Sequence, residues 1–331
     1  MKIARIFTCL FLAVFLVTAF CGAIRANPVP IPPGELNLPV EIAEEWLEAS
    51  PDNNILEGAI FDQDGNPLFC DVSQRKALRV SPGKNLETLI NLPAMGAGGL
   101  AWHKDGRLFM AALDLAAKAG AILAWSPDSG ELETIVPVDY GFWPNDLVFA
   151  PDGGFYFSDF RGDASHPIGG IYYVSPDFKN IAPVIPNLAQ ANGVALSPDG
   201  RTLWATEFAK NRLHRAELTS PSEISPTGSS IPWHFAGPAP DSMRVDSEGN
   251  VYVAIYGQGR AMIFNKKGIP IGQILIPGRE KGENLLTTSL ALDPGAKELF
   301  IVTSNDEKGK PARIFKAPAF AKGQKPVIRQ K

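Results

Sequence analysis

Residues 196–205, Leu196-Ser-Pro-Asp-Gly-Arg-Thr-Leu-Trp-Ala205, join two apolar runs through an Asp-Gly turn. Glycine accepts the positive φ that tight hairpin turns need, so Asp-Gly between apolar runs predicts a β-hairpin. The pattern recurs at residues 61–70, 102–111, 149–158 and 245–254, and in degenerate form at 292–301. The turn glycines, at positions 65, 106, 153, 200, 249 and 295, are 41 to 49 residues apart. Each interval has room for a four-stranded sheet.

Further strands follow each hairpin. A third apolar run stands at residues 121–124 and 212–215, for example, and fourth strands such as 86–90 and 132–136 complete the unit. Six four-stranded antiparallel units in series are typical of an all-β, six-bladed β-propeller, whose radial closure leaves only short sheet edges. A β-solenoid fits less well, because its repeats are shorter and contain fewer turns. We therefore predict a six-bladed propeller domain over residues 53–331.

The N-terminus reads as a separate segment. Lys2 and Arg5 precede an uncharged run over residues 6–24, and small residues follow it, so residues 1–26 resemble an export signal peptide. We expect cleavage after Ala23 or Ala26 and a periplasmic or extracellular protein. The alternative is an uncleaved membrane anchor over residues 6–24, and lipidation of Cys21 is a weaker one. Residues 27–52 would form an extension whose short helix, over residues 40–49, lies across the outside and helps to close the ring.

Composition excludes several classes of function. The chain has 331 residues, of which 45% are hydrophobic and 20% charged, with a net charge of −4 and no basic stripe, so no nucleic-acid partner is expected. Contact with a membrane is expected only through an uncleaved leader. Cys70 is the one cysteine beyond the leader and lies in an apolar run, which favours a packing role. The histidines are too scattered for a zinc site: His103, His166, His214 and His234.

One position of the repeat carries polar residues in an apolar setting. It lies seven residues before the acidic turn position, at the start of the expected innermost strand, where equivalent residues of all blades should encircle the channel. Its occupants are Glu57, Gly98, Asn145, Asn192, Asp241 and Thr287. Four of them offer carboxylate or amide oxygens, the ligands that Ca²⁺ prefers. Without sulfur or nitrogen ligands the set favours Ca²⁺, with Mn²⁺ or Mg²⁺ as substitutes, over zinc or copper. The alternative is that each side chain only makes structural hydrogen bonds.

The loops between second and third strands should surround this ring. The loop at residues 159–167 carries Arg161 and His166, which are candidate substrate contacts. Equally, the loop could be solvated, with Arg161 paired to Asp159 or Asp163. Asp146 follows a ring residue, so strand alternation predicts that it points to the opposite strand face and has a structural role.

Several motifs carry a family resemblance. Leu56-Glu-Gly58, Pro144-Asn-Asp-Leu147, Ala191-Asn-Gly193 and Pro240-Asp-Ser242 resemble the senescence marker protein/gluconolactonase/luciferin-regenerating enzyme family of six-bladed propellers. The stretches at residues 154–162 and 256–260 are most similar to its calcium-dependent drug-responsive lactonases. The resemblance implies a metal-dependent hydrolase that opens the ester bond of a small lactone. It also implies that Glu57, Asn145, Asn192 and Asp241, assisted by Ser242, bind the ion, and that Asp241 transfers the proton.

The chain departs from those lactonases in two ways. They carry a carboxylate at the position of Asn145, and they hold a second calcium near residues that here lack ligand types: Ala117, Ala119, Pro137, Tyr140 and Phe142. We therefore expect one ion. As a mechanism, the ion would polarise the lactone carbonyl, and either Asp241 or the ion would activate the water. The alternatives are a sugar-acid lactonase, or a non-catalytic, calcium-stabilised binding propeller in the cell envelope.

Overall fold

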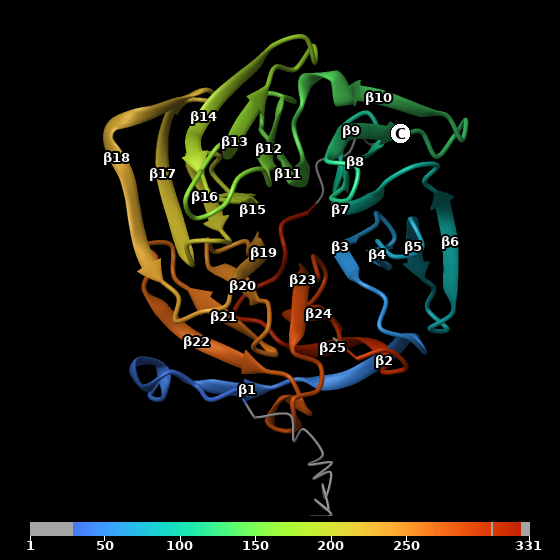
Figure 1. Cartoon of the computed structure of the whole chain (residues 1–331), viewed down its shortest axis with the longest axis vertical. Helices are drawn as coiled ribbons and strands as arrows, with labels where there is room; N and C mark the ends of the chain where they lie inside the picture. Colours follow the sequence, from blue (N-terminus) through green and yellow to red (C-terminus); the bar gives the residue numbers. More distant parts are fainter. Residues whose placement is uncertain (1–28, 306, 326–331) are drawn as a thin grey trace, which may run out of the picture.

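Six sheets stand like blades around a central channel in the computed structural model, which describes residues 29–305 and 307–325 (Figure 1). The predicted all-β, six-bladed propeller is confirmed. The leader predicted over residues 1–26 lies outside the described residues. Within the described ranges, no helix is both long enough and apolar enough to cross a bilayer.

The strands of each blade follow one another from the channel outward, and all within a blade are antiparallel to their neighbours apart from β1. Blades one to three comprise β3 (Leu56–Phe61), β4 (Pro67–Asp71), β5 (Lys76–Val80), β6 (Leu86–Asn91); β7 (Gly96–Trp102), β8 (Leu108–Asp114), β9 (Ala119–Trp125), β10 (Leu132–Val136); β11 (Pro144–Phe149), β12 (Phe155–Asp159), β13 (Gly169–Val174) and β14 (Ile181–Leu188). Blades four to six comprise β15 (Ala191–Leu196), β16 (Thr202–Glu207), β17 (Arg212–Ser220), β18 (Glu223–His234); β19 (Pro240–Val245), β20 (Val251–Ile255), β21 (Arg260–Phe264), β22 (Pro270–Leu275), β1 (Val40–Ile42); β23 (Leu286–Leu292), β24 (Glu298–Ser304), β25 (Ala312–Pro318) and β2 (Glu44–Ser50).

The N-terminal extension closes the ring as strands, so the helix predicted over residues 40–49 is wrong. β2 pairs antiparallel with β25 and supplies the outer strand of the last blade, while β1 pairs parallel with β22. The segment contains good helix formers, but the unpaired edge of β25 offers a full hydrogen-bond ladder, and tertiary context overrides such propensities. Trp46 also packs edge-to-face on Phe300, with ring centroids 4.9 Å apart.

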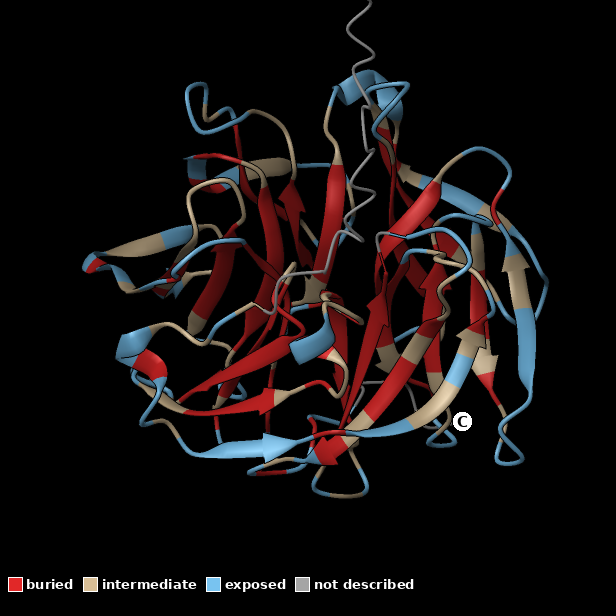
Figure 2. Cartoon of the chain, turned by 60° about the horizontal axis from the view of Figure 1, so that its bottom comes forward, coloured by how far each residue is buried: buried red, intermediate tan, exposed pale blue. Residues whose placement is uncertain are grey.

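The hydrophobic core lies between neighbouring blades, as the buried inner strands and exposed outer strands of Figure 2 show. Phe109 of the second blade packs on Phe155 of the third, with ring centroids 5.7 Å apart. Cys70 is fully buried in a cluster shared by blades one and two, which confirms its predicted packing role. Burial raises the pKa of its thiol, as do the charges of Glu57 and Asp71.

The hairpin turns explain the recurring sequence pattern. Five of the six turn glycines have φ between +70° and +97°, a region that L side chains rarely adopt. Gly295, in the degenerate sixth copy, does not share this positive φ. The inner strand therefore starts at one end of the channel, and the second strand returns to that same end.

Candidate functional site

The inner strands share an irregularity at the position that the sequence singles out. The register between first and second strand shifts between Pro144 and Leu147 in β11 and between Pro240 and Met243 in β19. β3, β7, β15 and β23 shift at equivalent places. A β-bulge bends a strand and re-aims its side chains. The six bulges together mark one level of the channel, at the start of every inner strand.

Backbones approach closely at this level. A Cβ on Gly98 would lie 2.7 Å from the carbonyl oxygen of Asn145, and one on Gly193 would lie 2.7 Å from that of Asp241. No side chain fits at such distances. Between the first and last blades, the amide of Ala59 donates to Ser289 Oγ at 3.1 Å. The ring of inner strands is therefore tight here, and residues far apart in sequence meet at one end of the channel.

The four candidate ligands are all buried, with 3–8% of each residue exposed: Glu57, Asn145, Asn192 and Asp241. Among the described residues, Asn145 Oδ1, Asn192 Oδ1 and Asp241 Oδ1 accept no hydrogen bond. Thr287 Oγ1, from the sixth blade, is likewise without a partner there. A buried acceptor without a donor costs about 1–3 kcal/mol. Several such oxygens at one level indicate that something other than protein satisfies them.

The electrostatics point the same way. Burial, followed by the charges of Asp241 and Asp146, raises the pKa of Glu57 well above its usual range. Burial also raises the pKa of Asp241, although a hydrogen bond from Asn192 opposes this. Ser242 Oγ, the fifth candidate ligand, lies 3.5 Å from Glu57 Oε2. The structure therefore brings residues of blades one, four and five together, and their acidic groups repel each other unless a cation or protons compensate.

These residues fit a hard divalent cation. The donors are carboxylate, amide and hydroxyl oxygens, which suit Ca²⁺ better than zinc or copper. In residues 29–305 and 307–325, no group of three or more His, Cys, Asp or Glu side chains is arranged for a metal. The candidate site has only two carboxylates, so amide oxygens would have to complete it.

Strand alternation predicts that Asp146 points away from the channel. The structure shows that it does not. Its carboxylate is fully buried and lies 3.0 Å from Arg244 Nη1. The Arg244 guanidinium also donates to the carbonyl of Ala59 at 3.1 Å, so it joins inner strands of blades one, three and five. Burial raises the pKa of Asp146, and Arg244 opposes this rise. The bulge in β11 is the reason, because it breaks the alternation between residues 145 and 146.

Three carboxylates at the ends of second strands fix the chain just before candidate ligands. Asp71 Oδ2 accepts a hydrogen bond from Asn54 Nδ2 at 2.6 Å. Asp159 Oδ1 accepts one from the Trp143 amide at 3.0 Å. Glu207 similarly accepts one from the backbone amide of residue 189, at 2.9 Å. Sequence reasoning assigned this role to none of the three, although an acidic residue recurring at this place in the repeat is a usable signal.

The two candidate substrate contacts lie differently. Arg161 forms an ion pair with Asp159, with Nη2 2.7 Å from Oδ2. Its Cζ also lies 5.1 Å from the centroid of the Phe142 ring. This matches the ion-pair alternative that the sequence left open. His166 is exposed over 82% of its side chain and lies 3.7 Å from Asp163. The structure brings neither residue into the ring of buried oxygens.

An arc of aromatic rings lines the same end of the channel. Phe160, Phe208 and Tyr256 each directly follow the second strand of their blade, in blades three, four and five. Each donates its backbone amide to the residue two positions before a candidate ligand. Phe208 lies 5.7 Å from both Phe160 and Tyr256 between ring centroids, and all three are half-buried. This aromatic arc (Phe160, Phe208, Tyr256) offers an apolar surface beside the buried oxygens.

Comparison with known proteins identifies relatives of this chain. Residues 55–305 match the SMP-30/Gluconolactonase/LRE-like region. Lactonase drp35 of Staphylococcus saprophyticus is 46% identical over 299 residues, which is 89% of this chain and 92% of that protein. Lactonase drp35 of Staphylococcus aureus strain USA300 is 41% identical over 312 residues, 93% of this chain and 96% of that protein.

Solved structures support the fold. The calcium-binding protein regucalcin of Agrobacterium tumefaciens superposes with a TM-score of 0.72 at 17% identity, covering 88% of this chain and 99% of that one. A gluconolactonase of Xanthomonas campestris has a TM-score of 0.66 at 19% identity, covering 84% of this chain and 95% of that one. At such identities the likeness establishes the propeller architecture alone.

Proposed function

Because this chain belongs to the SMP-30/gluconolactonase/LRE-like family, we propose that it is a lactone-hydrolysing enzyme that depends on one calcium ion. Near full-length relatives at 46% and 41% identity are lactonases, which supports a hydrolase acting on a small lactone. The observation that carries the proposal is the set of buried acceptor oxygens without partners on Asn145, Asn192 and Asp241.

Glu57, Asn145, Asn192 and Asp241 would hold the ion, and Ser242 would assist from its place beside Glu57. When bound, calcium supplies Lewis-acid polarisation of the lactone carbonyl. Asp241 takes the proton of the attacking water at its carboxylate and returns it to the ring oxygen as the ester bond breaks. Burial raises the pKa of Asp241 in the metal-free protein, and a bound cation would favour its ionised, proton-accepting form.

Substrate selection would fall to the aromatic arc. Its half-buried rings favour lactones with an apolar body, since burial of apolar surface contributes roughly 25 cal/mol per Å². Arg161 and His166 remain candidate substrate contacts, and both lie in the loop between β12 and β13. Arg161 would have to leave Asp159 to bind substrate directly.

Hydrolysis of dihydrocoumarin and gluconolactone tests the proposal, with calcium, with chelator, and with calcium restored. We expect activity that chelation abolishes and calcium restores, and a preference for dihydrocoumarin. Glu57→Gln should lower activity strongly at limiting calcium, whereas Glu131→Gln, at an exposed site without an ion pair in the described structure, should not. A folded, calcium-binding protein without activity on either lactone would favour a binding propeller instead.

Export is a separate proposal that rests on the leader. A basic start, an uncharged run over residues 6–24 and small residues near Ala23 and Ala26 support it. Cell fractionation and N-terminal sequencing of the isolated protein test it. A new N-terminus at residue 24 or 27 in the exported fraction supports cleavage, and an intact N-terminus in the membrane fraction supports an anchor.

A further inference from the structure

A cavity of about 470 Å³ lies at the other end of the channel from the candidate cation site. Its walls are the far ends of the inner strands and the turns that follow them, together with the C-terminal residues Gln324 and Lys325. None of the five candidate ligands lines it. The volume is in the range of pockets that enclose small organic molecules, about 300–1,000 Å³.

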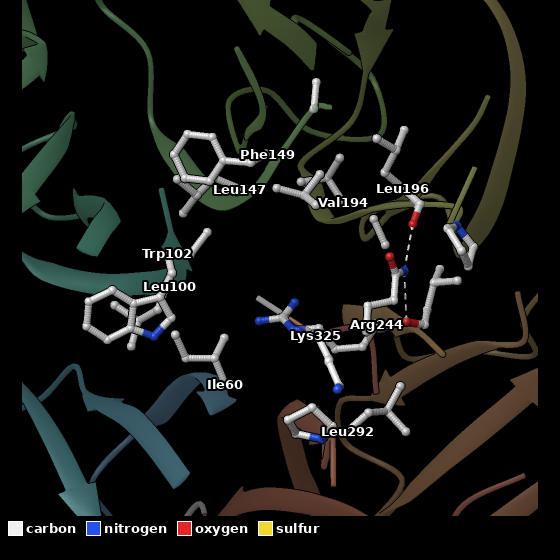
Figure 3. A pocket seen from close by; sticks show the side chains of 18 of the residues that line it. Ile60, Leu100, Trp102, Leu147, Phe149, Val194, Leu196, Arg244, Leu292 and Lys325 are labelled. Carbon is white, nitrogen blue, oxygen red and sulfur yellow. Dashed lines mark hydrogen bonds between the residues drawn. The ribbon is translucent and has the colours of Figure 1, made fainter. Parts of the chain in front are cut away.

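The wall of this far-end cavity is mostly apolar. Figure 3 shows a ring of apolar side chains contributed by every blade, around an opening into which two cationic side chains reach. The labelled apolar residues are Ile60, Leu100, Trp102, Leu147, Phe149, Val194, Leu196 and Leu292. Such a wall suits the hydrocarbon or aromatic body of a ligand.

The charge of the wall has one sign. Lys104, Arg244 and Lys325 line the cavity, together with His103, and none of the lining residues that the structure describes is acidic. Asp146, behind Arg244 and fully buried, is the one carboxylate that pairs with any of the three cations in the described structure. Two positive charges therefore remain without a carboxylate partner beside an apolar surface.

Arg244 retains binding capacity. Its Nη1 and Nη2 donate to Asp146 and to backbone carbonyls, whereas its Nε makes no hydrogen bond with any described residue. The guanidinium is thereby held in one position, with 18% of the side chain exposed. A pre-positioned cation loses little conformational entropy when an anion binds.

The C-terminal segment holds Lys325 at the cavity. Gln324 Nε2 donates to the carbonyls of Leu196 and Val245, both at 3.1 Å, and so bridges blades four and five (Figure 3). Two residues before Gln324, the carbonyl of Lys322 accepts a hydrogen bond from the Ser247 amide at 2.8 Å. Lys325, directly after this anchor, makes no ion pair with the described residues.

We propose that the far-end cavity binds a small amphipathic monocarboxylate. Its apolar body would pack inside the ring of side chains, and its carboxylate would lie between Arg244 and Lys325. Charge complementarity carries this choice, because the described wall of this apolar space presents three cations and no acidic side chain. The inference does not rest on the proposed lactonase function, since the walls of the cavity and the candidate cation site share no residue.

Isothermal titration of the full chain with 3-phenylpropionate, in excess chelator at neutral pH, tests the proposal. Chelator excludes binding to a metal at the other end of the channel. We expect saturable binding, and at least tenfold weaker binding of the neutral 3-phenylpropanamide. Lys325→Glu should weaken carboxylate binding at least fivefold. Lys118→Glu, the same change at an exposed lysine on the opposite face, should leave it unchanged.

Three results would overturn the proposal: no binding in chelator, equal binding of acid and amide, or a Lys325→Glu protein that binds like the wild type. Ile60→Trp places bulk inside the cavity and should abolish binding. Thermal unfolding checks that this variant is folded. If the variant is not folded, the double variant Lys104→Glu with Lys325→Glu is titrated in its place. Both lysines are exposed, so these changes do not disturb the core.

Discussion

The carboxylate of Asp146 lies 3.0 Å from Arg244 Nη1, and this buried ion pair separates two chemically different ends of one channel. On one side lie Glu57 and Asp241, whose pKa values are raised. On the other lies the apolar, cationic cavity. The Arg244 guanidinium thus counters part of the negative charge at the candidate cation site while contributing positive charge to the far end.

Arg244→Met should destabilise the protein strongly, because it leaves Asp146 buried without its partner. Removing one member of a buried ion pair typically costs about 3–5 kcal/mol in the free energy of unfolding. Asp146→Asn combined with Arg244→Met removes both charges and should recover most of that loss. Urea unfolding of the three proteins in chelator measures this. A single variant as stable as the wild type would show that the pair does not couple the inner strands.

The stability of the metal-free protein should depend on pH in a defined direction. The raised pKa values of Glu57 and Asp241 mean that the folded protein binds protons more tightly than the unfolded chain, whose carboxyls titrate near 4.5 and 3.8. The stability that these two groups contribute is therefore greatest below those values and is lost as pH rises toward the raised pKa values. In chelator, the thermal midpoint should fall by about 5 °C or more between pH 5 and pH 8.

Calcium should reverse the fall in the thermal midpoint at pH 8, since a bound cation compensates the ionised carboxylates. A ligand at 100 times its Kd stabilises the folded state by about 2.7 kcal/mol. Thermal unfolding at pH 5 and pH 8, with calcium and with chelator, makes the comparison. A thermal midpoint that is the same in all four conditions would argue against a cation at this site.

Glu57→Gln and Asp241→Asn should respond differently to excess calcium. Both lose a buried ligand charge, so both should bind calcium at least tenfold more weakly. Only Asp241 is proposed to move the proton, so saturating calcium should restore much of kcat to Glu57→Gln but leave Asp241→Asn at least a hundredfold low. Calcium titrations of kcat measure both. Equal recovery would assign Asp241 to metal binding alone.

The sequence predicts the propeller and the ring of candidate ligands because both depend on local, repeated features. Asp-Gly turns set the period, and a polar residue at the start of an apolar strand stands out without any tertiary information. Strand alternation predicts the wrong side for Asp146 because it assumes a regular strand, and the bulge in β11 makes the strand irregular at this residue. No local feature of the sequence predicts that bulge.

The prediction of an N-terminal helix is wrong for a related reason. The stretch Glu44-Glu-Trp-Leu-Glu-Ala49 consists largely of helix formers, and only the free edge of β25, more than 260 residues away, makes it a strand. The far-end cavity cannot be predicted from the sequence either. It is assembled from turns of several blades and from Gln324 and Lys325, whose arrangement depends on closure of the ring.

Phe208→Ala should weaken the use of apolar lactones without weakening calcium binding. Phe208 is the middle ring of the aromatic arc, 5.7 Å from both neighbours, so its loss removes apolar contact on two sides. We expect KM for dihydrocoumarin to rise about three- to tenfold with little change in kcat, and Phe208→Leu to recover most of the loss. Steady-state kinetics at saturating calcium measures this. A loss confined to kcat would mean that Phe208 positions the reacting groups instead.

Closure of the ring should depend on Glu35, a residue outside the blades. Glu35 Oε2 lies 2.6 Å from Arg260 Nη1, both residues are almost fully buried, and the Glu35 carbonyl accepts a hydrogen bond from Gln273 at 3.0 Å. Glu35→Gln leaves the Arg260 charge buried without a carboxylate, so we expect a loss of about 3–5 kcal/mol in the free energy of unfolding. Glu41→Gln, at an exposed position on β1, is the matched control and should change stability by less than about 0.5 kcal/mol. Urea unfolding compares the two proteins, and limited proteolysis shows whether the N-terminal strands detach first. If Glu35→Gln unfolds like the control, pairing of β1 and β2 with the blades is sufficient to hold the ring closed.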